Sequence, residues 1–268
     1  MNFLDFISAL IIFLNAGFLS AIVARFTGAN MTILILCSLL YAGAAPLEAA
    51  GIMMTFIVFM RLTMYTQHHP VNYKEFQIFR GWRLAIPVVL ILAGLFFYPF
   101  AALAIFLAFF ISELLYRIYH EMPKERRMAP SALAGYAAVA SVITAVSFAV
   151  VSFIPETWYY GIAGTAILLL CVFFWWVGQN RRRLAGAWDT VILASFIPAG
   201  LFGFDLSDWI EDMRRSTGTS RLAYNLPFIV LPAFFVGFVA ANVLFGIFSF
   251  SGLILTFFAA LAIRLFGY

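Results

Sequence analysis

The chain has 268 residues, of which 65% are hydrophobic and only 10% are charged, and its mean hydropathy is +1.01. A water-soluble domain needs a polar exterior, with roughly one quarter of its residues charged, so this composition excludes an ordinary soluble globule. The net charge of +4 would suit a nucleic-acid partner in a soluble protein, but here the basic residues lie in short connections between apolar runs, so no nucleic-acid partner is expected.

The apolar runs predict one all-α domain over residues 1–268, a polytopic transmembrane bundle of about 8–10 segments with the lipid bilayer around it. The predicted segments are 3–24, 31–45, 47–66, 82–98, 99–119, 131–153, 155–178, 188–204, 227–248 and 250–267. Prolines mark several of these boundaries, because the amides of a first helical turn lack intrahelical partners in any case.

The orientation follows from three basic connections, which lie around residues 67–83, 117–130 and 179–187. Two predicted spans separate each of them from the next, so all three are expected on one side of the membrane. The positive-inside rule makes that side the cytoplasm of a bacterial inner (plasma) membrane. The long connection 205–226 follows one further predicted span and is therefore expected on the external side.

The first polar break in the apolar pattern joins the first two segments. It contains Arg25, Thr27, Gly28 and Asn30, and the segment 31–45 that follows is short for a full crossing. We therefore expect a re-entrant or broken helix near residues 25–46, since non-helical backbone at membrane depth survives only in protein or beside a wet cavity. Arg25 and the amides near Asn30 would attract an anion. The alternative is an ordinary cytoplasmic turn in which Arg25 obeys the positive-inside rule.

The third segment supplies three further candidates. Pro46 begins it, and Glu48 in its first turn suits the helix dipole, or would couple protons if it faced a cavity. Thr55 is an intramembrane hydrogen-bonding residue of the kind that either joins helices or binds substrate. Arg61 lies close enough to a helix end for its side chain to snorkel to the interface.

No cofactor is expected. Cys37 and Cys171 lie in separate apolar stretches, and His68 and His69 lack both a third ligand and helical spacing, so neither pair predicts a metal site. Haem-attachment and nucleotide-binding glycine patterns are also missing from the sequence. A transporter requires none of these groups, and the chain is not expected to be an enzyme.

The stretch from Gly17 to Gly94 resembles the first half of the sulfite exporter TauE/SafE family of small membrane permeases. The motifs that carry the likeness are Gly17-Phe18, Thr27-Gly28-Ala29, Gly43-Ala44-Ala45-Pro46-Leu47-Glu48-Ala49-Ala50-Gly51, Tyr65-Thr66-Gln67-His68-His69, Val71-Asn72-Tyr73 and Leu84-Ala85-Ile86-Pro87. The resemblance implies a permease for a small anion, sulfur-containing or organic. It favours a substrate site made by Arg25, Thr27, Gly28, Asn30, Pro46, Glu48 and Thr55.

Two departures from the family pattern leave other functions open. The family has a run of glycines where this chain keeps Gly28 alone, and no second copy of the glycine break is visible in the expected two-fold repeat of 1–119 and 131–268. The main alternative is a non-transporting membrane subunit that anchors or assembles a partner complex, and a homo-oligomer is equally compatible with the sequence. A third alternative is an intramembrane enzyme, for which Glu113 with His120 is the only loose candidate.

Overall fold

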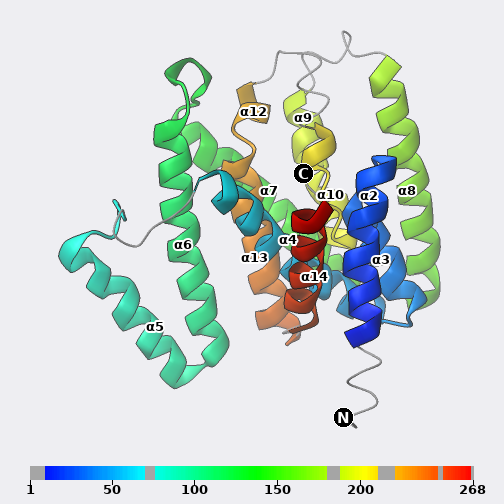
Figure 1. The fold of residues 1–268 in the computed structure, drawn as a ribbon, viewed down its shortest axis with the longest axis horizontal. Helices are drawn as coiled ribbons and strands as arrows, with labels where there is room; N and C mark the ends of the chain where they lie inside the picture. The colour runs from blue at the N-terminus through cyan, green and yellow to red at the C-terminus, as the bar shows by residue number, and fades with distance from the viewer. Residues whose placement is uncertain (1–9, 70–75, 180–187, 211–220, 247–249, 267–268) are drawn as a thin grey trace.

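A computed structural model describes residues 10–69, 76–179, 188–210, 221–246 and 250–266, and this part of the chain is an all-α bundle without strands (Figure 1). The helices are η1 (Asn15–Leu19), α2 (Ser20–Thr27), α3 (Met31–Tyr41), α4 (Pro46–His68), η3 (Gly81–Leu84), α5 (Ala85–Phe97), α6 (Pro99–Glu121), η4 (Lys124–Arg126), α7 (Pro130–Val151), α8 (Glu156–Gln179), α9 (Trp188–Ala194), α10 (Phe196–Phe202), α12 (Arg221–Tyr224), α13 (Pro227–Phe245) and α14 (Phe250–Phe266).

Six of the described helical stretches are long and apolar enough to cross a membrane, which makes this a multi-pass membrane protein. They are Leu10–Thr27, Pro46–His68, Phe100–Glu121, Pro130–Val151, Glu156–Val177 and Pro227–Phe245. The prolines act as the sequence predicts, since α4, α6, α7 and α13 each carry proline in the first turn.

Helix α4 is the centre of the bundle, and α5 and α8 lie at its edge. In the most apolar stretch of α4, 72% of the residues are buried against α13, α14 and α10, whereas in α8 the figure is 11%. Helix α5 packs along α6 and stands with it to one side of the other helices (Figure 1). Its outer face presents large apolar side chains such as Val89, Leu92 and Phe96, as expected where lipid is the solvent.

The predicted break near residues 25–46 is confirmed. Gly28 ends α2 in the left-handed conformation with φ 69°, and α3 begins three residues later. Helix α4 runs the length of the bundle, so the turn before Pro46 lies at the far end from His68. Helix α3 has 11 residues, about 16 Å at 1.5 Å per residue, and so reaches only partway back from that far end. Helices α2 and α3 thus form a hairpin whose tip, residues 28–30, is exposed at Gly28 and buried at Asn30.

The segment 188–204 also turns back inside the bundle, which corrects its assignment as a full span. Gly203 ends α10 with φ 67°, and a Cβ at this position would lie 2.2 Å from the Cβ of Met53 on α4. Only glycine satisfies both the left-handed backbone and this close approach. Residues 204–206 are non-helical and buried, and the chain then becomes helical again over 207–210.

Residues 221–226, the described end of the predicted connection 205–226, consequently lie at the same end of the bundle as the connection 117–130, and the prediction that the two connections face opposite sides is wrong. The Nδ2 of Asn225 donates to the carbonyl of Arg126 at 2.9 Å, and the Arg126 guanidinium lies 4.6 Å from the ring centre of Tyr224. In the other two predicted basic connections, residues 70–75 and 180–187 lie outside the described residues.

Candidate functional site

A pocket of about 800 Å³ opens at the end of the bundle where α4 and α6 terminate. Its mouth is formed by residues such as His69 and Pro123, and its wall by α2, the second half of α4, the end of α6, α12 and α14. Its floor lies where the tip of the first hairpin, residues 28–32 between α2 and α3, meets the tip of the second hairpin, residues 203–207 after α10. The pocket is therefore reached from one end of the molecule and ends at the two helix breaks.

A buried charge lies beside these tips. Arg61 on α4 lines the pocket, yet its side chain is only 7% exposed. Its Nε donates to Oδ2 of Asp205, which is also buried, and its Nη1 donates to Oδ1 of Asp208 at 2.8 Å. A guanidinium in this position requires such partners, because an isolated buried charge is very costly.

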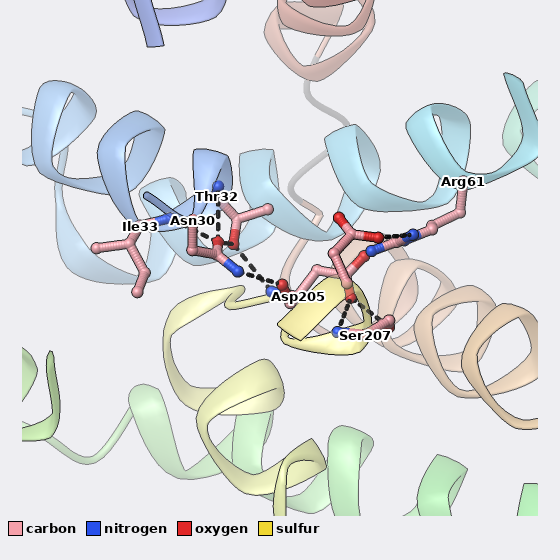
Figure 2. A network of polar contacts seen from close by, with 7 residues as sticks. Asn30, Thr32, Ile33, Arg61, Asp205 and Ser207 are labelled. Carbon is pink, nitrogen blue, oxygen red and sulfur yellow. Dashed lines mark hydrogen bonds and ion pairs between the residues drawn. The ribbon is translucent and has the colours of Figure 1, made fainter. Parts of the chain in front are cut away.

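Asp205 is held by both hairpins, as Figure 2 shows. Its Oδ1 accepts from the backbone N–H and the hydroxyl of Ser207. Its own backbone N–H donates to Thr32 Oγ1 at 2.9 Å, and its carbonyl accepts from Asn30 Nδ2 at 2.6 Å. The second tip is thereby bonded to the first through main-chain groups of Asp205 that are buried and would otherwise be unsatisfied.

Asn30 organises the first tip in the same way. Its Oδ1 accepts from the backbone amides of Thr32 at 3.0 Å and Ile33 at 3.4 Å, and from the Thr32 hydroxyl at 2.6 Å. This is the standard N-cap of a helix, in which a side-chain oxygen satisfies amides of the first turn. With Oδ1 capping α3 and Nδ2 bonded to Asp205, Asn30 joins the two tips.

The two tips share one local motif, Gly-x-Asn/Asp-x-Thr/Ser. The first copy is Gly28-Ala29-Asn30-Met31-Thr32 and the second is Gly203-Phe204-Asp205-Leu206-Ser207. In both copies the glycine has positive φ, and the acid or amide oxygen accepts from the backbone and hydroxyl two residues later. The break at Gly28 therefore has a local counterpart at Gly203, whereas the two-fold repeat of 1–119 and 131–268 stays a prediction. The likeness is hard to see in the sequence because each turn carries a single glycine and Asn is exchanged for Asp.

Part of the predicted site lies in the pocket. Arg25, Gly28 and Asn30 line it, and Arg25 is exposed. Thr27 is next to the lining but not part of it, since its hydroxyl donates to the Val23 carbonyl at 2.7 Å and accepts from the backbone of Ala29.

The structure does not bring Pro46, Glu48 and Thr55 to the pocket. Pro46 lies 15 residues before Arg61, about 22 Å away along the axis of α4, so it and the exposed Glu48 lie at the opposite end of the bundle. Thr55 is buried in a helix contact, where its hydroxyl donates to the Gly51 carbonyl and its Cβ faces Gly252 of α14. These three residues lie outside the pocket because only the second half of α4, from Phe56 onward, lines it.

The mouth of the pocket carries a second polar cluster. His69 Nδ1 is hydrogen-bonded to Glu121 Oε2, and Arg117 Nε donates to Oε1 of the same carboxylate at 2.8 Å. These contacts fasten the end of α4 to the end of α6. Glu113, by contrast, does not line the pocket, and its carboxylate accepts from the backbone amides of Ile78 and Phe79.

The formal charges at the floor nearly cancel. Arg61 with the carboxylates of Asp205 and Asp208 sums to −1, Arg25 in the pocket wall brings the sum of these four to zero, and Glu121 at the mouth adds one negative charge. The two aspartates differ in hydration, because the Asp205 side chain is 4% exposed and that of Asp208 is 58% exposed. The carboxylate of Asp205 is therefore buried, and the carboxylate of Asp208 faces water.

Comparison of the chain with known protein families, with curated proteins and with solved structures finds no match.

Proposed function

We propose that this protein is a secondary permease for a small anion, sulfur-containing or organic, and that the pocket is the vestibule through which the solute reaches its site. The observation that carries the proposal is the buried Arg61 at the floor, where the tips of two broken helices meet. Secondary transporters characteristically bind solutes near the mid-membrane breaks of discontinuous helices. Intramembrane charges of this kind are expensive and are retained for function.

An anion fits this floor better than a cation or a neutral solute. Arg61 and Arg25 supply positive charge, and a guanidinium matches the paired oxygens of a sulfonate, sulfite or carboxylate. The capped start of α3 adds the positive end of a helix dipole. The likeness of residues 17–94 to the sulfite exporter family points to the same class of solute, and we retain that relationship as part of the proposal.

We infer that the pocket opens to the cytoplasm of a bacterial inner membrane. Basic residues gather in the connections at the pocket end, among them Arg117, Lys124, Arg126, Arg127 and Arg221. The far-end turns at 42–45, 98 and 152–155 contain neither lysine nor arginine. The positive-inside rule assigns the basic end to the cytoplasm.

The test is anion flux into proteoliposomes that contain the purified protein. Arg25→Ala should abolish the flux of sulfite while membrane insertion and yield stay normal, because Arg25 is exposed in the pocket wall and carries little of the packing. Arg264→Ala is the matched control, since Arg264 is exposed on α14 outside the pocket lining and should transport normally.

Normal flux through the Arg25→Ala protein would remove Arg25 from the site. A wild-type protein that carries no anion and co-purifies with another membrane protein in fixed proportion would replace the permease with an anchoring or assembly subunit.

A further inference from the structure

Two carboxylates bind one arginine at the floor of the pocket, and they are held very differently. We propose that Asp208 is a built-in substitute for the transported anion, which occupies Arg61 in the empty pocket and is displaced from it when the solute binds. The inference rests on the proposed function, because it names the residue that the solute must replace at that same site.

Asp205 has the properties of a permanent partner. Its side chain is 4% exposed, and one carboxylate oxygen is bound to Arg61 while the other accepts two hydrogen bonds from Ser207. Its backbone is bonded on both sides to the first hairpin tip, through Asn30 and Thr32. Moving this carboxylate would disrupt both tips.

Asp208 has the properties of a replaceable partner. Its side chain is 58% exposed and lines the pocket, so its carboxylate is already largely hydrated. Among the described residues, its one hydrogen bond is the 2.8 Å contact with Arg61 Nη1. A small oxyanion offers Arg61 the same charged oxygen at the same distance, so the exchange preserves the charge-assisted hydrogen bond.

The charge balance favours this exchange. Arg25, Arg61, Asp205 and Asp208 sum to zero and Glu121 at the mouth adds a further negative charge, so an anion that entered without displacement would make the pocket more negative. If the Asp208 carboxylate moves out to water as the anion arrives, the charge around Arg61 is unchanged. The Asp208 carboxylate competes with the anion for Arg61. The apparent affinity for the anion is therefore the intrinsic affinity multiplied by the fraction of molecules in which Asp208 has left Arg61.

The experiment measures binding of two probes, sulfite and methanesulfonate, to the purified full-length protein by titration calorimetry. Asp208→Asn keeps the shape of the side chain and removes its charge, and should tighten binding about tenfold if Asp208 leaves Arg61 in one molecule in ten. Asp208→Glu keeps the competing carboxylate and should bind like the wild type. The matched control is Glu125→Gln, which removes a negative charge from the same end of the bundle at an exposed position outside the pocket lining.

The outcomes separate this inference from the permease itself. Unchanged or weaker binding by Asp208→Asn, in a protein whose wild type binds and carries an anion, would overturn the displacement and leave the transport function standing. Tighter binding by Asp208→Asn in a protein that carries no anion would support the displacement and remove transport. If neither probe binds to the wild type or to Asp208→Asn, the displacement is wrong whatever the flux assay gives.

Discussion

Arg61 and Asp205 form a pair that is costly to bury and more costly to break. Taking two charges out of water carries a large desolvation penalty, which their attraction and the surrounding hydrogen bonds offset. Removing one member leaves the other buried without compensation. Because the two side chains are 7% and 4% exposed, solvent provides little screening for the remaining charge.

We therefore expect Arg61→Gln to lower the free energy of unfolding by about 3–5 kcal/mol, because it leaves Asp205 buried and unpaired. The double variant Arg61→Gln with Asp205→Asn should recover much of that loss, since both buried charges are then gone. Denaturant unfolding in detergent micelles measures the difference. Arg264→Gln, which changes an exposed arginine, should stay within about 0.5 kcal/mol of wild type, and an equal loss there would contradict the argument.

The sequence identifies Arg25 and Asn30 as candidates, but not the Arg61 cluster. Arg61 lies about two turns from the end of α4, and at that depth a snorkelling side chain and a buried site residue have the same sequence signature. The contact with Asp205 identifies Arg61 as a buried site residue and not a snorkelling one. Asp205 is 144 residues away in the chain, so only the fold reveals this contact. The useful local signal is the Gly-x-Asp-x-Ser pattern at 203–207, which repeats the pattern at 28–32.

At the scale of helices, hydropathy predicts the length of an apolar segment well, but it does not predict whether the segment crosses the membrane or turns back within the bundle. Segment 188–204 contains 17 residues, about 25 Å of helix, which approaches the roughly 30 Å hydrocarbon thickness. It divides into α9 and α10 and then turns at Gly203. The segment 31–45 is easier to recognise from the sequence, because 15 residues are too few for a helix that crosses the membrane. Both turns are stabilised by hydrogen bonds between the two tips. A hydropathy profile of the sequence cannot show these bonds.

The second hairpin depends on a close contact with α7. A Cβ at Gly200 would lie 2.5 Å from both the Thr144 carbonyl oxygen and the Ser147 Cβ, so Gly200→Val should push α10 away from α7. We expect a loss of about 1–3 kcal/mol of stability, as for other overpacked cores, together with loss of sulfite flux. Gly164→Val is the matched control, because a Cβ there meets nothing within 4 Å, and it should be close to wild type in both assays.

For the whole molecule, one misassigned span reverses everything that follows it in the chain. If every predicted segment crossed, both termini would be external. Because the chain turns back at Gly203, α13 starts at the pocket end and α14 returns there, so that Ile263 lines the pocket. Of the three basic connections predicted to share a side, 117–130 is described throughout and lies at the pocket end, and the sides of the other two stay a prediction.

Cysteine labelling in cells tests this arrangement, with Cys37 and Cys171 first replaced by serine. A membrane-impermeant maleimide should label Phe153→Cys in intact cells, because residue 153 lies in the far-end turn between α7 and α8. Glu125→Cys and Arg221→Cys should react only after the membrane is permeabilised. Labelling of Arg221→Cys in intact cells, with Glu125→Cys protected, would place the connection 205–226 on the outside after all.

The crossed bonds between Asn30 and Asp205 and between Asp205 and Thr32 have a mechanical consequence. They lock the two hairpins together at their tips, so the pair behaves as a single plug. In the proposed permease, a solute would then not leave through the far end by a small movement of one helix. Either the plug slides as a unit against the surrounding helices, or both bonds rupture together, and a disulfide engineered across the tips would permit the first route while forbidding the second.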